Sequence, residues 1–313
     1  MDPGKPIGPV LTDIDVLDRR FAPVVANYPD LERLATGAIW SEGPVWIAED
    51  DSVLWSDIPN DRMLRWSARD GMRVWRERVE FTNGHARDLD GSLLHCSHGL
   101  RAIFRTAVDG SGQRTVVDRW KGRRFNAPND IVVKSDGTIW FTDPPYGLII
   151  PEEGHGGESE IGDCYVFRLD PRIGTVEPVT DLPEHPNGLA FSPDESMLYV
   201  SDTSGALPGH GSNHCIWAFD VVEGRPLANG RVFAEVSPGV PDGFRVDAQG
   251  WIYTSAQDGV QVLHPDGTLI GRIRVPEKVG NVTFGGPGRD VLYIAASTSL
   301  YRIRLATRGV QRP

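Results

Sequence analysis

Six polar residues recur at the same place in six similar stretches of the chain. They are Glu42, Asn83, Asn129, Asn187, Asp242 and Asn281, at intervals of 41, 46, 58, 55 and 39 residues. Carboxylate and amide oxygens are hard ligands that suit Ca²⁺, Mg²⁺ or Mn²⁺, and they suit Zn²⁺ less. Two carboxylates packed together without a cation would repel each other and raise each other's pKa. If the six side chains converge, we therefore expect one divalent cation among them, and Ca²⁺, Mg²⁺, Mn²⁺ and, less readily, Zn²⁺ all remain open.

A second interpretation of these residues is purely structural. Asn129, Asn187 and Asp242 each follow a proline, and Asn or Asp after Pro often closes a turn at the start of a strand. Glu42 fits that interpretation less well, because Glu is a poor turn former. One Glu, one Asp and several Asn at one repeat position are hard to explain by turn chemistry alone.

The elements that must position these residues are short strands. Each of the six polar residues begins an apolar strand, which a turn connects to a second strand rich in aromatic and β-branched residues. The turns include Asp90-Gly91, Asp136-Gly137, Asp194-Glu195 and Gln249-Gly250, and glycine supplies the positive φ of a tight hairpin. Weaker strands such as Cys164–Leu169 and Ile216–Phe219 complete four strands per repeat. This spacing is typical of propeller blades, so we predict an all-β, six-bladed β-propeller with four-stranded antiparallel blades around a central channel.

The whole chain is predicted to form one propeller domain over residues 1–313, with residues 1–30 as an N-terminal arm packing on it. Only about one strand pair follows Asn281, so the segment Leu31–Ala38 is expected to supply the missing strand of the last blade. That closure removes an exposed sheet edge. A short helix is predicted over Asp13–Arg20.

Composition excludes several classes of protein. Gly 35 and Pro 24 in 313 residues favour many short strands over long helices, while 40% hydrophobic residues rule out a disordered chain. The net charge of −11 disfavours binding to nucleic acid, and the one dense basic run, Arg119–Arg124, is predicted to be a solvated hairpin. No 18-residue apolar run exists to span a membrane. Proline and aspartate within the first 20 residues, together with three separated cysteines, predict a cytoplasmic protein with reduced thiols.

Four long motifs give the chain a specific resemblance. They are SEGPVW at 41–46, FNAPNDIVVKSDGTIWFTDPPYG at 125–147, HPNGLAFSPDESMLYVSD at 185–202 and PDGFRVDAQGWIYT at 241–254. In these motifs and their order the chain resembles the SMP-30/gluconolactonase/LRE family, and the motif ending in DPPYG resembles its bacterial gluconolactonase-like branch. The resemblance implies a six-bladed, calcium-dependent propeller that hydrolyses a sugar lactone to the aldonic acid. It also implies that Glu42, Asn129, Asn187 and Asp242 hold the divalent cation.

Roles in catalysis follow from this chemistry. A bound cation would polarise the lactone carbonyl, and we assign Asp242 as both a metal ligand and the general base that activates water. Asn83, His98 and Tyr146 are predicted to bind the substrate, with Tyr146 at the start of an insertion, residues 144–162, that is expected to cover it. Animal regucalcin-type members carry an arginine two residues before Asn129 that contacts sugar hydroxyls, whereas this chain has Ala127. The identity of the sugar therefore cannot be transferred.

Two alternatives remain open on the sequence. A related calcium-dependent propeller that hydrolyses organophosphates or other esters would use a similar ring, and a non-catalytic propeller scaffold would bind a protein and need no metal. The motifs of serine hydrolases, zinc proteases and dinucleotide-binding enzymes are absent from the sequence.

Overall fold

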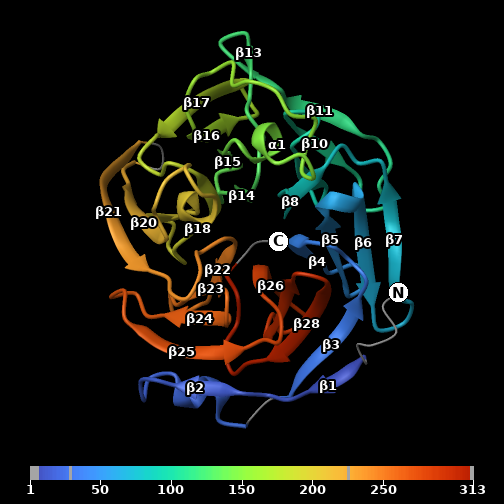
Figure 1. The fold of residues 1–313 in the computed structure, drawn as a ribbon, viewed down its shortest axis with the longest axis vertical. Coiled ribbons are helices and arrows are strands. Elements are labelled where there is room, and N and C mark those ends of the chain that lie inside the picture. The colour runs from blue at the N-terminus through green and yellow to red at the C-terminus, as the bar shows by residue number, and fades with distance from the viewer. Residues whose placement is uncertain (1–6, 28–29, 224–225, 311–313) are drawn as a thin grey trace.

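Six antiparallel β-sheets surround a central channel in the computed structural model, which describes residues 7–27, 30–223 and 226–310. In Figure 1 the sheets follow one another around the ring in chain order, from blue through green and yellow to red. The predicted all-β, six-bladed propeller is confirmed.

Blades 1 to 5 each contain four strands in sequence order, running from the channel outward. Blade 1 consists of β4 (Ser41–Ile47), β5 (Ser52–Asp57), β6 (Arg62–Ser67) and β7 (Gly71–Glu77). Blade 2 consists of β8 (Thr82–Arg87), β9 (Leu93–Ser97), β10 (Ala102–Thr106) and β11 (Arg114–Val117). Blade 3 consists of β14 (Ile131–Val133), β15 (Ile139–Asp143), β16 (Tyr165–Asp170) and β17 (Thr175–Thr180). Blade 4 consists of β18 (Pro186–Phe191), β19 (Met197–Asp202), β20 (Cys215–Val221) and β21 (Leu227–Glu235). Blade 5 consists of β22 (Phe244–Val246), β23 (Ile252–Ala256), β24 (Gly259–Leu263) and β25 (Leu269–Arg274).

Blade 6 is assembled from both ends of the chain. Its strands are β26 (Val279–Gly285), β27 (Val291–Ala296), β28 (Ser299–Arg304) and β3 (Leu31–Thr36). The antiparallel pairing of β3 with β28 confirms that the segment after residue 30 closes the propeller. Closure in this way pairs the first and last parts of the fold and leaves no open seam between blades 6 and 1.

Apolar side chains between neighbouring blades form the core. Successive residues of a strand face opposite sides of its sheet, so Ile131 packs between blades 2 and 3 whereas Val132 packs between blades 3 and 4. Likewise, Trp140 packs between blades 3 and 4, and Phe141 packs between blades 2 and 3. Because both faces of a blade pack on its neighbours, the second strand of every blade is almost entirely buried, and each blade depends on its two neighbours.

The N-terminal arm adds strands to the outside of two blades. β1 (Gly8–Val10) pairs with β3, and β2 (Ile14–Val16) pairs with β25. Phe21 is fully buried, and its ring packs directly on the backbone of Gly271. A Cβ added at Gly271 would lie only 2.1 Å from Cδ1 of Phe21. The arm thus covers the outer edges of blades 5 and 6 (Figure 1).

The predicted helix over Asp13–Arg20 is wrong, because Ile14–Val16 is a strand. The outer edge of β25 offers unpaired backbone groups, and the alternating Ile-Asp-Val sequence suits a strand that pairs with such an edge. The first helical turn of the described chain is instead a 3₁₀ helix, Ala22–Val25.

A short hairpin and a few helical turns lie outside the blades. The basic run forms the predicted hairpin of β12 (Arg119–Trp120) and β13 (Arg123–Arg124). The insertion at 144–162 contains a short helix α1 (Tyr146–Ile149), and two further 3₁₀ helices cover Ile58–Asn60 and Ser204–Ala206. Cys96, Cys164 and Cys215 are free thiols. Among the described residues, no helix combines the length and the apolar character needed to cross a membrane.

Candidate metal centre and active site

The six polar residues meet at one mouth of the channel, linked by their side chains. Asn83 Nδ2 donates to Asn129 Oδ1 at 2.5 Å, and Asn129 Nδ2 donates to Asn187 Oδ1 at 2.5 Å. Asn187 in turn donates to the carboxylate of Asp242. On the far side of the ring, Asn281 Nδ2 donates to Glu42 Oε2 at 3.2 Å. These contacts bring residues up to 239 positions apart into one polar ring, and all except Asp242 are at least 95% buried.

Bulges in the inner strands occur where the ring residues lie. The pairing register shifts between Glu42 and Val45 in blade 1, and equivalent shifts begin at Thr82, Pro186 and Val279 in blades 2, 4 and 6. A bulge interrupts the alternation of side chains and re-aims one of them. The bulges therefore accompany the turn of the ring side chains towards the channel axis.

Glycines beside the ring residues allow neighbouring blades to approach closely. A Cβ on Gly84 would lie 2.4 Å from the carbonyl oxygen of Asn129, and one on Gly243 would lie 1.9 Å from Cγ of Asn281. The amide of Gly84 donates to that same Asn129 carbonyl at 2.8 Å. Only glycine leaves room for this backbone contact, which explains the Asn-Gly and Asp-Gly pairs at these positions.

A hydroxyl residue near the end of a second strand holds the ring residue of the next blade. Ser56 Oγ donates to the carbonyl of Asn83 at 2.7 Å, and Ser201 Oγ donates to the carbonyl of Asp242 at 2.6 Å. Thr142 Oγ1 makes the same bond to Asn187 at 2.7 Å. The ring is thus fixed by bonds that cross from blade to blade.

The aspartate that follows each of these hydroxyl residues fixes the loop leading into its own blade. Asp57 accepts the backbone N–H of Ile39, and Asp202 accepts that of His185. Asp143 accepts the N–H groups of Asn126 and Ala127 at 2.8 and 2.9 Å, and burial raises the pKa of Asp143 to about 7. Sequence reasoning missed the role of these three residues, although the repeated Ser-Asp and Thr-Asp dipeptides were visible as a signal.

The two carboxylates of the ring are electrostatically strained. Burial first, and then the charge of Asp242, raises the pKa of Glu42 well above its usual value. Burial likewise raises the pKa of Asp242 to about 6. Glu42 Oε1 is buried and has no hydrogen-bond partner. A carboxylate oxygen that lacks a hydrogen-bond donor and lies next to the partly exposed carboxylate of Asp242 is in an environment that a bound cation would relieve.

The donor set fits a hard cation better than a soft one. No group of three or more His, Cys, Asp or Glu side chains suited to a metal occurs within residues 7–27, 30–223 and 226–310. The ring instead combines two carboxylates with amide oxygens of Asn residues, and Ca²⁺ accepts both kinds of ligand. The residues present therefore fit the predicted cation, with Glu42 and Asp242 supplying the charge.

His98 and Tyr146 both lie at this mouth, where the sequence analysis expected substrate contacts. His98 Nδ1 is 2.9 Å from the carbonyl oxygen of Glu153, and its Nε2 is 3.1 Å from Asn129 Oδ1. Both facing atoms are oxygens that can only accept, so each ring nitrogen faces an acceptor, whereas burial lowers the pKa of His98 and so opposes a proton on both nitrogens. Burial raises the pKa of Tyr146 well above its usual value, with the charge of Asp242 as a second cause.

The insertion at 144–162 contributes Glu153, a residue that sequence reasoning did not select. Its carboxylate Oε2 is 4.0 Å from His98 Nδ1, and its side chain is 20% exposed. Burial, followed by the charge of Asp242, raises the pKa of Glu153 to about 7. Gly154 packs directly on Gly147, since an added Cβ would lie 2.2 Å from the carbonyl oxygen of Gly147. The insertion is therefore folded back on itself and presents a third carboxyl group to the ring mouth.

Fold and site together define a six-bladed propeller with a ring of carboxylate and amide groups at one channel mouth. The sequence pattern of the SMP-30/Gluconolactonase/LRE-like region matches residues 40–298. The chain belongs to this family, which confirms the resemblance found in its motifs.

Relatives of known activity share most of the chain. The gluconolactonase of Zymomonas mobilis is 34% identical over 302 residues, covering 89% of this chain and 82% of its own length. A pentonolactonase of Haloferax volcanii is 31% identical over 262 residues, covering 82% of this chain and 81% of its own length. The crystal structure described as a gluconolactonase from Xanthomonas campestris has a TM-score of 0.88 and 39% identity, with 97% of this chain and 98% of that chain aligned.

Proposed function

We propose that this protein is an enzyme that hydrolyses a sugar lactone to the aldonic acid at the ring mouth, with one divalent cation bound there. The observation that supports this most directly is the buried carboxylate of Glu42 beside the partly exposed carboxylate of Asp242, with Glu42 Oε1 lacking a hydrogen-bond donor. The family relatives named gluconolactonase and pentonolactonase support the substrate class.

Glu42, Asn129, Asn187 and Asp242 would hold the cation, with Ca²⁺ as the ion that best suits them. When bound, the cation would act as a Lewis acid on the lactone carbonyl. Asp242 is the ring carboxylate with surface facing the mouth, so it can reach a water molecule as well as the cation.

The carboxyl groups divide the proton transfers between them. Asp242 takes a proton from the attacking water while the water oxygen bonds to the carbonyl carbon. The bond from that carbon to the ring oxygen then breaks, and the departing alkoxide takes a proton from Glu153. Asp242 then loses its proton to solvent and Glu153 takes one up from solvent, which restores both groups for the next turnover.

Polar and aromatic groups at the mouth would orient the sugar. Asn83 and His98 face the ring from blade 2, and Tyr146 packs edge-on against His185 with ring centroids 5.6 Å apart. Ala127 offers no group that could bind a hydroxyl, so recognition of the sugar rests on these other side chains.

The test is an assay of aldonolactones, including gluconolactone and pentonolactones, after the metal has been removed by a chelator. We expect hydrolysis above the spontaneous rate to disappear and to return with Ca²⁺, and we expect Glu42→Gln to need more Ca²⁺ than wild type. Glu235→Gln, an exposed position on β21, is the matched control.

Full activity in excess chelator would exclude the role of the cation. Hydrolysis of phosphotriesters instead of lactones would favour the ester hydrolase alternative, and inactivity without metal binding would favour a scaffold.

A further inference from the structure

A buried pair of histidines lies beside blade 1, apart from the groups that the proposed reaction uses. His85 on β8 and His95 on β9 stand opposite each other in the pairing of the two strands, and neither side chain is exposed. Their Nδ1 atoms are 2.9 Å apart, and the two rings meet edge to face with centroids 4.9 Å apart. Burial of two imidazole rings costs free energy unless their nitrogens find hydrogen-bond partners.

The inner strand of blade 2 departs from the repeat at this point. Blade 2 carries His85 two residues after its ring residue. Blades 3, 4 and 5 carry buried apolar residues at the same position, which are Ile131, Leu189 and Phe244. An apolar side chain therefore satisfies the fold here, and the imidazole of His85 needs another explanation.

Hydroxyl groups extend the histidine pair at both ends. His85 Nε2 is 3.0 Å from Ser56 Oγ on β5, and His95 Nε2 is 2.9 Å from Thr106 Oγ1 on β10. Ser56 Oγ also donates to the carbonyl oxygen of Asn83 at 2.7 Å. These four side chains, Thr106, His95, His85 and Ser56, form a histidine relay. The relay ends on the backbone of a ring residue, and every member of it is buried.

The acceptor at the end of the relay sets the direction of every hydrogen bond in it. The Asn83 carbonyl can only accept, so the one hydroxyl proton of Ser56 points to it, and Ser56 Oγ accepts from His85 Nε2. In the neutral rings, His85 Nδ1 is then the acceptor, His95 Nδ1 is the donor, and Thr106 donates to His95 Nε2. Burial lowers the pKa of His85 to about 3 and that of His95 well below its usual value. Both rings are therefore neutral at neutral pH, as this order of bonds requires.

Asn83 is the point at which the relay meets the site. Its Nδ2 donates to Asn129 Oδ1 at 2.5 Å, so Oδ1 is the atom of Asn83 that can accept a hydrogen bond from a ligand. The carbonyl of Asn83 is also wedged against Gly43, where an added Cβ would lie 2.3 Å from the oxygen. Blade 1 thus holds the backbone of Asn83 through Gly43 and Ser56 together.

We propose that the histidine relay positions Asn83 to bind a hydroxyl group of the lactone, an inference that rests on the proposed function. His95 fixes the tautomer of His85. The N–H of His85 holds Ser56 Oγ, which in turn holds the carbonyl of Asn83. Without His95, the ring of His85 is free to accept from Ser56, and the hydroxyl proton would turn away from Asn83. Hydrogen bonds in such a chain also polarise one another. The members of the relay are positioning residues, because they act through Asn83.

The test compares KM and kcat for the aldonolactones at saturating Ca²⁺. His85→Leu, which introduces the residue type of blade 4, should raise KM about 5–10-fold and change kcat less than about 2-fold, because a bond made equally in the ground and transition states affects only binding. His85→Gln should restore most of the affinity, since an amide can still donate to Ser56 Oγ. In the background of Asn83→Ala, His85→Leu should not raise KM further.

Phe104→Leu is the matched control for packing. The ring of Phe104 stacks on His95 with centroids 4.6 Å apart, but it makes no hydrogen bond of the relay. This variant should lower the melting temperature and leave KM unchanged. The proposal would be overturned by an unchanged KM for His85→Leu, by an equal rise for Phe104→Leu, or by effects of His85→Leu and Asn83→Ala that simply add.

Histidine ¹⁵N NMR of the full chain tests the relay without substrate. We expect the proton on Nε2 of His85 and on Nδ1 of His95, and neither ring should titrate above about pH 5. The opposite tautomers would overturn the relay. If wild type hydrolyses no lactone, the proposed function fails, and the side-chain amide signal of Asn83 then decides about the relay. That signal should shift in His85→Leu and stay in place in Phe104→Leu, and the lack of a selective shift would refute the relay.

Discussion

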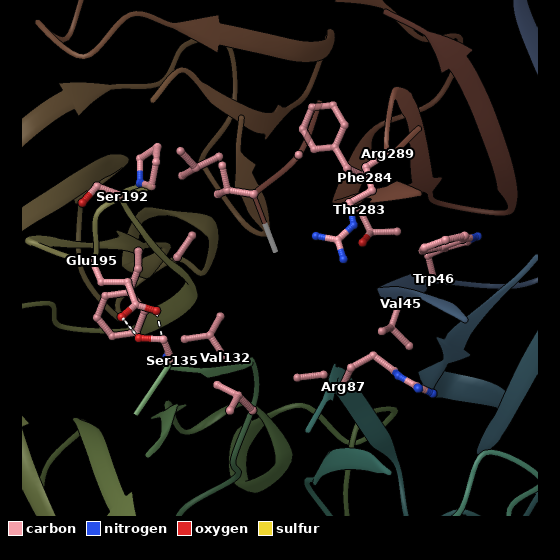
Figure 2. A pocket seen from close by; sticks show the side chains of 18 of the residues that line it. Val45, Trp46, Arg87, Val132, Ser135, Ser192, Glu195, Thr283, Phe284 and Arg289 are labelled. Carbon is pink, nitrogen blue, oxygen red and sulfur yellow. Dashed lines mark hydrogen bonds between the residues drawn. The ribbon is translucent and has the colours of Figure 1, made fainter. Parts of the chain in front are cut away.

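The two mouths of the channel are built from the same six strands but have opposite character. At one mouth the strands present Glu, Asp and Asn, held by bulges, glycines and hydrogen bonds that cross between blades. At the other mouth, two to four residues along, the same strands present mostly Val and Ala, with Thr283 on the last of them (Figure 2). The fold therefore supplies two equivalent openings, and only side chains decide which of them can hold a cation.

The difference shows how a symmetric scaffold can localise chemistry. Buried carboxylates are unfavourable without compensation, so the polar mouth needs an extensive supporting network. The inner strands at the other mouth rely more on apolar contacts, because Val45, Val132 and Ala190 belong to the clusters that hold neighbouring blades together.

The largest effect is expected at the polar mouth, for Asp242→Asn. The amide keeps an oxygen in the ring but cannot accept the proton, so turnover of lactone should fall by about 10²–10⁴-fold. Metal content at saturating Ca²⁺, measured by mass spectrometry, should change much less. Asp247→Asn, on the same blade near the opposite mouth, is the control and should retain turnover. Normal turnover by Asp242→Asn with metal bound would show that another group activates water.

The buried ion pair between the mouths should matter next, through stability. Arg245 Nη1 on β22 lies 3.2 Å from Asp130 Oδ2, and both side chains are almost fully buried. Arg245→Met leaves Asp130 buried and without its cation, which should lower the free energy of unfolding by about 3–5 kcal/mol. Urea unfolding measures this loss, and the double change Asp130→Asn with Arg245→Met should recover much of it. Arg302→Met, which breaks a partly exposed pair with Glu32, should cost only about 0–1 kcal/mol. Equal losses for the two single variants would argue against a buried pair.

A smaller effect is expected from Gly243→Ala, which tests the close approach of blades at the polar mouth. The added methyl group would overlap the side chain of Asn281, so the free energy of unfolding should fall by about 1–3 kcal/mol and the affinity for Ca²⁺ should weaken. The comparison variant is Ala190→Gly at the other mouth, which removes one methyl group instead of adding one. It should cost about 0.5–1 kcal/mol and leave Ca²⁺ affinity unchanged.

The smallest effect is expected at Glu277, just before β26, and it depends on pH. Burial raises the pKa of Glu277, but hydrogen bonds from Ser299, Thr298 and Tyr301 lower it to about 2. A depressed pKa stabilises the fold above the unfolded pKa near 4.5, and this contribution is lost as pH falls towards 2. Glu277→Gln should therefore lower the free energy of unfolding by about 1–2 kcal/mol at pH 7. Urea unfolding should show the gap to wild type closing between pH 5 and pH 2, whereas a gap independent of pH would contradict the role of the charge.

Much of this molecule could be predicted from local sequence. The six repeats gave the number of blades, and the Asp-Gly turns marked the hairpins, because these features depend on backbone preferences within a few residues. The closing strand β3 could be inferred from a strand missing at the other end of the chain. The segment Ile14–Val16 could not, because its structure depends on the free edge of β25, some 255 positions away.

For the site, the repeats alone predicted which residues meet, since equivalent positions of propeller blades must face one axis. How these residues meet depends on contacts between blades. Bulges turned the side chains, and burial together with the neighbouring carboxylate shifted the pKa of Glu42. Glu153 reached the mouth only because its insertion folds back between Gly147 and His98. The Arg245–Asp130 pair and the lining of the other mouth joined residues from separate blades. Such contacts depend on distances across the channel, which no local pattern in the sequence encodes.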